Sequence, residues 1–306
     1  MARLFLFLSL FILISCGNSA DQKVENSIDR AQTYLSSGKC DDALKALEGA
    51  RDMDNAVYVQ VLASVYACKA DVEIVDVITE LENFNVNKVF SELSKKKFAL
   101  TNDITNINHM KNSLNVILST TDIVSQSERD LKFGKRKGQD LGMQLLFYSL
   151  IQASKFTNYF GNAEDGKKGE KGGTNLCFLN YITDVGLLFS ANPIYTVPAT
   201  NACQGIGDGH PDLDITTTSG RTNACQGVIA INNVLDTLEQ IEFGDSEQLK
   251  ILKNISEKIA QLKSVLINID GSLVDIFEVR DTKSCLELED RELELFIFAF
   301  YEMGFE

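Results

Sequence analysis

An acidic turn around a histidine is the part of this sequence that comes nearest to a chemical site. His210 is flanked by Asp208, Asp212 and Asp214, so three carboxylates fall within seven residues. Carboxylates at alternating positions near a glycine are typical of calcium loops, because Ca²⁺ takes about six to eight oxygen ligands. The segment lacks the distal glutamate that an EF-hand loop requires. The three aspartates are therefore a candidate metal site, and a solvated acidic turn is the alternative.

No other grouping of residues predicts catalysis. His109 lies in an Asn-rich helical stretch without an acidic partner nearby in sequence, which favours a surface or core histidine. Ser-x-x-Lys strings occur at 36–39 and 94–97, but the companion motifs of serine acylating enzymes are missing, as is a Gly-x-Ser-x-Gly elbow. We therefore expect a protein that is not an enzyme and needs no cofactor.

The first 15 residues predict an export signal. Arg3 precedes an almost unbroken apolar run at 4–14, which is shorter than the roughly 20 residues that a membrane-spanning helix needs. Residues 13–16 (LISC) resemble the lipobox of bacterial lipoproteins. The resemblance implies cleavage before Cys16 and attachment of a diacylglycerol to its sulfur. The alternative is an ordinary signal peptide with an incidental cysteine.

A lipidated Cys16 would place the protein in a bacterial cell envelope, attached to the membrane through its lipid anchor only. Gly17 and Asn18 follow the cysteine, and the absence of an aspartate there favours the outer membrane, on its periplasmic face. The longest later apolar stretch, 295–301, has seven residues and predicts a buried helix end, not a second anchor.

Six cysteines remain, an even number in a chain destined for an oxidising compartment, and they predict three disulfides. Six thiols allow about 15 pairings. Proximity in sequence favours Cys40 with Cys68 and Cys203 with Cys225, which leaves Cys177 for Cys285. Small buried thiols are the alternative. Zinc is disfavoured because the sequence holds no C-x-x-C pair.

The composition of the 306 residues indicates a folded, helical and acidic protein. Hydrophobic residues make up 44% of the chain and the mean hydropathy is −0.04, which is enough apolar material for a sizeable core. The chain has only three prolines, which break helices, and its long Leu-, Lys- and Glu-rich runs favour helices. The formal charge of −14 and a pI near 4.7 argue against nucleic-acid binding.

The N-terminal third shows paired helices with small residues at regular positions. Ala31, Tyr34, Gly38, Ala43, Leu47 and Ala50 resemble the tetratricopeptide-repeat pattern, in which small residues allow two helices to approach closely and an aromatic fills the space between them. Asn55 stands where that family prefers proline. Ala63, Tyr66 and Ala70 repeat the first half of the pattern, so a second unit is expected over 56–84. Helical hairpins of another family are the alternative.

The rest of the sequence predicts a helix over 104–124, a polar linker over 125–137 and a central buried helix over 141–160. Gly- and Cys-rich loops follow at 161–227, and Thr-Asn-x-Cys strings predict helices that begin at 174 and 222. Apolar stripes over 228–241 and 249–266 predict a C-terminal helical hairpin. In the last helix the acidic residues are expected on the outer face: Glu287, Glu289, Asp290, Glu292 and Glu294.

The sequence thus predicts an all-α protein with tetratricopeptide-like helical hairpins at the N-terminus, a disulfide-stapled loop region and a C-terminal helical hairpin. Its parts are a signal peptide (1–15), a tether (16–22), a tetratricopeptide-like region (23–124) and a second helical region (125–306). Stacked helix pairs leave a groove, which predicts a non-catalytic scaffold for envelope proteins or peptides. The alternative is a receptor for small solutes or calcium, with its pocket in 161–227.

Overall fold

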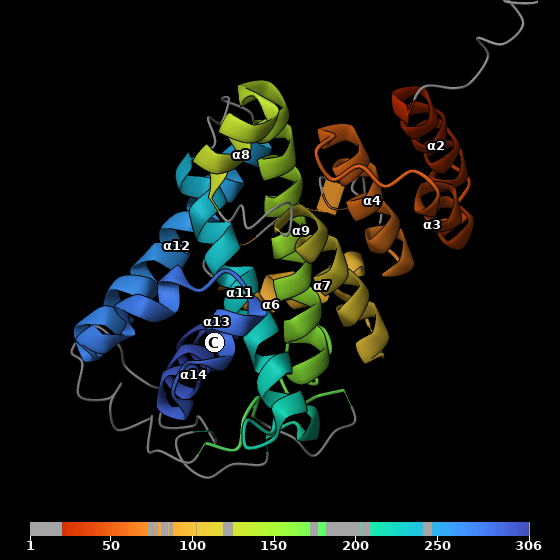
Figure 1. Cartoon of the computed structure of the whole chain (residues 1–306). Coiled ribbons are helices and arrows are strands. Elements are labelled where there is room, and N and C mark those ends of the chain that lie inside the picture. The colour runs from red at the N-terminus through yellow and green to blue at the C-terminus, as the bar shows by residue number, and fades with distance from the viewer. Residues whose placement is uncertain are drawn as a thin grey trace, which may run out of the picture.

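The computed structural model describes residues 20–72, 77, 79–80, 85, 88–101, 103–118, 125–171, 177–181, 203, 209–240 and 247–305. Within these ranges the regular elements are helices and no strand is present, which confirms the predicted all-α class. Figure 1 shows the long helix α9 (Lys135–Phe160) between the N-terminal helices and the C-terminal helices. The predicted signal segment and Cys16 lie outside the described ranges.

The first predicted helix pair is present. Helices α2 (Ala20–Leu35) and α3 (Cys40–Glu48) pack against each other, and α2 begins three residues before the predicted boundary at 23. Gly38 ends the turn between them with a φ of +67°, a conformation that glycine adopts without steric cost. The tether predicted at 16–22 therefore overlaps the first turn of α2.

Helix α4 (Ala56–Lys69) packs against α2 and α3 on one side and α7 (Ile104–Leu118) on the other. Asn55 caps it, because its side-chain oxygen accepts hydrogen bonds from the backbone nitrogens of Val57 at 3.0 Å and Tyr58 at 3.3 Å. The departure from the family's proline is thus a helix cap. Positions 73–76 and 81–84, where the partner of α4 is expected, lie outside the described ranges, so the tetratricopeptide arrangement stays a prediction.

The buried apolar residues form two clusters that meet at α4. Val24, Ile28, Ala31, Ala43 and Leu47 from α2 and α3 form the smaller cluster, together with residues of α4 such as Val65. Other α4 residues, Ala63 and Ala67 among them, belong to the larger cluster, which runs through the rest of the molecule. Helix α4 is therefore buried on two faces.

The linker predicted over 125–137 is wrong. Residues 126–133 form helix α8 (Gln126–Phe133), and α9 begins at Lys135. Ser125 and Glu128 form a capping box that starts α8. Gly138 allows α8 to lie close to α9, since a Cβ there would come within 2.6 Å of the Cα of Asp130. The many polar residues of this stretch hid a real helix, whereas the central buried helix over 141–160 is confirmed.

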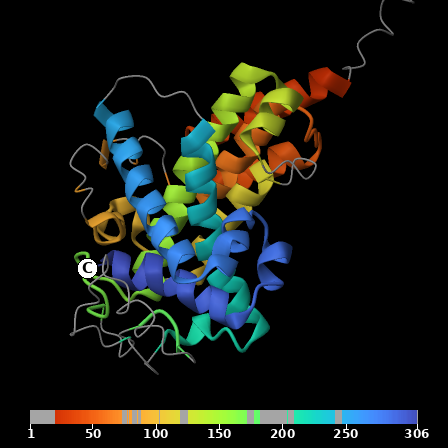
Figure 2. The same cartoon turned by 90° about the vertical axis from the view of Figure 1, so that its left-hand side faces the viewer.

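Two long helices form the predicted C-terminal hairpin. Helices α11 (Thr218–Gln240) and α12 (Glu247–Ile269) run side by side in Figures 1 and 2. Helix α11 begins one turn before the predicted start at 222. The helix expected from 174 is wrong over its described part, because residues 177–181 are not helical and Cys177 forms an isolated bridge with Gly209. The segments η4 (Gly271–Glu278), α13 (Thr282–Leu286) and α14 (Asp290–Ile297) follow, and the chain ends in η5 (Phe298–Glu302) and η6 (Met303–Phe305). The remaining elements are α6 (Val89–Lys95), η2 (Lys97–Ala99) and η3 (Pro211–Leu213).

Three disulfides are present, but only one joins the predicted partners. Cys40 binds Cys68, as expected from proximity. Cys177 binds Cys203 and Cys225 binds Cys285, so the predicted pairs Cys203 with Cys225 and Cys177 with Cys285 are wrong. Proximity in sequence favoured the pairing of Cys203 with Cys225. Cys225 instead points from α11 toward α13, which carries Cys285.

The last helix also corrects an expectation. Glu294 was expected on the outer face, but it is fully buried in α14. The helix continues as a π-helical turn over Phe298–Glu302, and this turn is buried as well. The predicted buried helix end over 295–301 is confirmed.

Candidate binding groove

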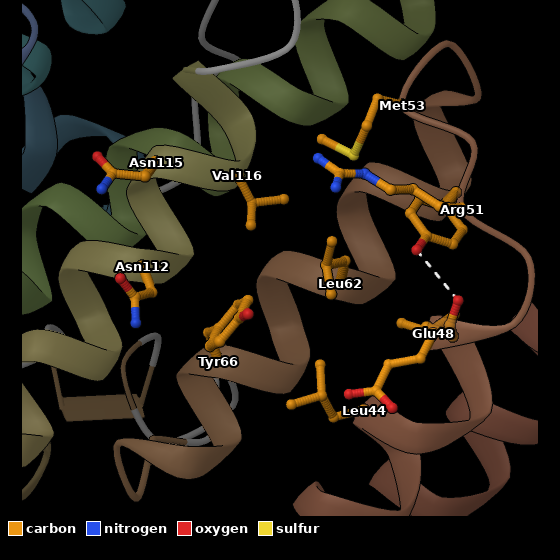
Figure 3. A pocket seen from close by; sticks show the side chains of 11 residues that line it. Leu44, Glu48, Arg51, Met53, Leu62, Tyr66, Asn112, Asn115 and Val116 are labelled. Carbon is orange, nitrogen blue, oxygen red and sulfur yellow. Dashed lines mark hydrogen bonds between the residues drawn. The ribbon is translucent and has the colours of Figure 1, made fainter.

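A groove lies between α3, the α3–α4 connection, α4 and α7 (Figure 3). Its volume is ≈ 520 Å³, within the range of about 300–1,000 Å³ that ligand pockets occupy. The side chains that line it come from all of these segments: Leu44, Leu47, Glu48, Arg51, Met53, Tyr58, Leu62, Tyr66, Asn112, Asn115 and Val116.

Helical spacing places the lining side chains of each helix on one face of that helix, toward the groove. Leu62 and Tyr66 are four residues apart on α4, and Asn112 and Val116 are four apart on α7, so each pair occupies one helix face. All four are partly buried, and Figure 3 shows Leu62 and Tyr66 between the walls formed by α3 and α7. The groove is therefore apolar in its middle and open to solvent.

One wall is fixed by a buried tyrosine. The Tyr58 hydroxyl donates a hydrogen bond of 3.2 Å to the carbonyl of Leu47 at the end of α3, which ties α3 to α4 (Figure 3). Burial raises the pKa of Tyr58, so this hydroxyl keeps its proton at neutral pH. The wall therefore has a defined shape before any ligand arrives.

The charged side chains of the groove differ in their ion pairing from other charged side chains of this region. Ion pairs join Lys69 to Asp41 at 2.6 Å and Lys132 to Asp54 at 2.7 Å, close to the groove in the fold. Glu48 and Arg51 are exposed, and neither forms an ion pair or hydrogen bond within the described ranges, although opposite charges stand only three positions apart.

The predicted groove residues divide among four places. Ala31, Ala43 and Ala63 are fully buried where helices meet. Leu47 and Tyr66 line the groove described above. Tyr34 and Ala50 line a second, more polar cavity of ≈ 790 Å³ between α2 and α3. Gly38 forms the turn described above.

The acidic turn is partly described. Asp214 accepts hydrogen bonds from its neighbour Thr216, and Asp212 accepts one of 3.0 Å from the Tyr159 hydroxyl. In the described part of the chain the two aspartates do not join a group of donor atoms close enough to hold a metal ion. Asp208 lies outside it, so the candidate calcium site stays a prediction.

His210 is held by two aromatic rings and a backbone hydrogen bond. Its ring packs against Tyr159 and Phe160 at centroid distances of 5.0 and 5.2 Å, and its Nδ1 accepts a hydrogen bond of 3.2 Å from the backbone nitrogen of Asp212. Burial lowers the pKa of His210, so the neutral imidazole is favoured. These contacts hold the turn at the end of α9.

Sequence reasoning missed a buried ionic cluster. Glu302 is fully buried in the terminal π-helical turn and forms an ion pair with Lys168. Its carboxylate also accepts hydrogen bonds from the backbone nitrogen of Phe178 at 2.7 Å and the hydroxyl of Tyr181 at 2.9 Å. Burial, followed by the charge of Glu302, raises the pKa of Tyr181. Nothing in the local sequence pattern links Glu302 to its three partners, each of which lies more than 100 residues away in the chain.

This cluster brings together donor atoms of Cys177, Cys203 and Glu302, which all lie within 4.8 Å of one another. The two sulfurs are bonded to each other, so they are not thiolate ligands. The ammonium of Lys168 lies 3.4 Å from the Cys203 sulfur and already neutralises Glu302. The cluster therefore anchors the loop segments to the C-terminal turn and does not offer a free metal site.

Comparisons with known proteins add no family. No protein-family profile, curated protein or solved structure matches this chain. Among the helices that the structure describes, none combines the length and the apolar character needed to cross a bilayer.

Proposed function

We propose that this protein is a lipid-anchored component of a bacterial cell envelope that acts as a non-catalytic scaffold and binds peptides or extended protein segments. The groove between α3, α4 and α7 carries the proposal. It offers apolar side chains in its middle and hydrogen-bonding and charged groups at its edges, the combination that a peptide requires.

The N-terminal sequence supports the proposed location. The lipobox-like residues 13–16 support acylation of Cys16, and two or three acyl chains give stable anchoring where one does not. The three disulfides support an oxidising compartment. Mass spectrometry of the membrane-extracted protein tests this part: we expect a first residue at Cys16 carrying fatty acids, and a chain beginning at Met1 would contradict it.

Binding is tested with a displayed random-peptide library selected on the full-length protein. Leu62→Lys places a charge on the apolar middle of the groove, at a partly buried position that packs against the smaller cluster and not the larger one. We expect enriched peptides to lose binding to Leu62→Lys and to keep it with Gln32→Lys, a matched change at an exposed position of α2. Equal binding by both variants would place the site elsewhere and contradict the proposal.

A second candidate function is the receptor for a small solute or calcium. One observation favours it: a further cavity of ≈ 610 Å³ is lined in part by residues at the start of the predicted loop region, namely Ala163, Glu164, Asp165 and Lys171. Thermal-shift measurements with calcium and with a panel of small polar solutes test it. We expect a stabilisation by at least one of them if this function is correct, and no shift across the panel would exclude it.

A further inference from the structure

The two ends of the groove carry side chains of opposite charge. Figure 3 shows the guanidinium of Arg51 at the end of the groove that holds Met53, and the carboxylate of Glu48 at the end that holds Leu44. Both side chains come from the same wall, yet the described residues provide neither with an ion-pair partner. Arg51 therefore supplies a cationic group at one end of the groove, and Glu48 supplies an anionic group at the other.

The opposite wall presents two side-chain amides. Asn112 and Asn115 stand on the groove face of α7, three residues apart, and both are partly buried. Neither amide has a hydrogen bond within the described ranges, whereas Ser113 between them donates one of 2.7 Å to the carbonyl of Ala63. An amide offers both a donor and an acceptor, which matches the backbone of an extended peptide.

Resting on the proposed function, we infer that the groove selects short peptide segments by the direction of their charge. An acidic group of the ligand lies at Arg51 and a basic group lies at Glu48. An apolar side chain between them occupies the middle, near Leu62 and Val116. The amides of Asn112 and Asn115 hydrogen-bond the peptide backbone.

Charge complementarity distinguishes this occupant from others. A uniformly basic ligand would meet Arg51, and a uniformly acidic one would meet Glu48, so each would gain at one end and lose at the other. A purely apolar ligand would leave the two amides without partners as it covered them, which is costly. A segment with one charge of each sign satisfies all four polar groups.

The experiment uses five-residue peptides with blocked ends, measured by fluorescence anisotropy on the full-length protein. Two carry the same composition in opposite order, Lys-Gly-Leu-Gly-Glu and Glu-Gly-Leu-Gly-Lys, and two more carry only acidic or only basic ends. We expect one of the two mixed-charge orders to bind about fivefold more tightly than its reverse, because each partly exposed charge pair contributes modestly. Both uniformly charged peptides should bind more weakly than the preferred order.

A charge-exchanged variant provides the decisive control. In the double variant Glu48→Arg with Arg51→Glu, the preference between the two mixed-charge peptides should reverse, while total charge and composition stay the same. Asn115→Leu should weaken both orders equally. An exchange of the same kind in the second cavity, Arg30→Asp with Asp29→Arg, should leave the preference unchanged.

The outcomes separate this inference from the proposed function. Binding that is lost in Leu62→Lys but shows no preference for charge order overturns the inference and leaves the peptide-binding function standing. No binding of any peptide, here or from the library, overturns both. If Leu62→Lys instead changes the sedimentation behaviour of the protein and no peptide binds, the groove is a contact between copies of the chain and the inference is wrong.

Discussion

The two ends of this molecule achieve stability in different ways. The smaller core beneath α2 and α3 consists of small and aliphatic side chains together with Tyr58, and its disulfide, Cys40 to Cys68, is partly exposed. The region around α9 and α11 buries many polar groups, an ion pair and two disulfides with fully buried sulfurs. The comparison teaches that local helical packing suffices at one end, whereas the other depends on contacts between positions far apart in sequence.

The largest effect is expected from Glu302→Ala. Removal of this carboxylate leaves Lys168, the Phe178 nitrogen and the Tyr181 hydroxyl without their partner in a buried place. We expect a loss of about 3–5 kcal/mol in the free energy of unfolding, measured by chemical denaturation. Glu278→Ala, at an exposed position, is the control and should cost little. A small effect at Glu302 would weaken the contrast between the two regions.

Gly138→Ala tests the close contact of α8 with α9. The added Cβ would meet backbone atoms of Asp130 at 2.6 and 2.7 Å, so the helices must separate. We expect a loss of about 1–3 kcal/mol, as for other overpacked sites. Gly49→Ala, at the end of α3, meets nothing within 4 Å and should change stability by less than about 0.5 kcal/mol. Equal thermal midpoints for the two variants would contradict the close packing.

Lys155→Met tests the cost of a buried charge in α9. Burial lowers the pKa of Lys155 to about 8 from its ordinary value of 10.5. Between these values the unfolded chain binds more protons than the folded chain, so stability should rise with pH as Lys155 loses its proton. We expect the methionine variant to be about 1–2 kcal/mol more stable than the wild type at pH 7.

The same advantage of Lys155→Met should shrink as the pH rises toward 9.5, because the wild-type lysine is then increasingly neutral. Denaturation curves for both proteins at several pH values measure this difference. Lys137→Met, at an exposed position of the same helix, should show no such dependence. A constant difference between wild type and Lys155→Met would show that packing, and not charge, is responsible.

The smallest effect is expected at the N-terminal end, from Asn55→Ala. The loss of the cap leaves the backbone nitrogens of Val57 and Tyr58 without their acceptor. The cost should be about 1 kcal/mol, and Asn55→Asp, which keeps a capping oxygen, should restore most of it. Thermal denaturation compares the variants. A cost as large as that of Glu302→Ala would mean that the smaller core is no less demanding than the larger one.

The sequence predicted those parts of the fold that follow from local periodicity. The apolar stripes of α9, α11 and α12, the turn at Gly38 and the pairing of Cys40 with Cys68 all depend on residues close in the chain. Helix α8 was missed because its buried residues, Gln126 and Arg129, are polar and Leu131 is exposed, so no apolar stripe marks a core-facing side. The capping box of Ser125 and Glu128 was a readable signal.

The candidate groove was predictable only in part. Leu47 and Tyr66 were recognised from their positions in the helical-hairpin pattern, and both line it. Asn112, Asn115 and Val116 were not recognised, because α7 reaches the groove by tertiary packing that no local pattern encodes. The partners of Cys177 and Glu302 were hidden for the same reason: they join segments separated by loops whose course a single sequence does not determine.

The position of α4 between two clusters of apolar residues has a dynamic consequence. Helices α2 and α3 can detach from their packing on α4 by exposing only the smaller cluster, with Cys40 still joined to Cys68, whereas α4 cannot leave without exposing the larger cluster as well. A ligand held jointly by α3, α4 and α7 would oppose that detachment in proportion to its occupancy. Amide hydrogen exchange in α2 and α3 should then slow when the groove is filled, which would make these two helices a reporter of binding.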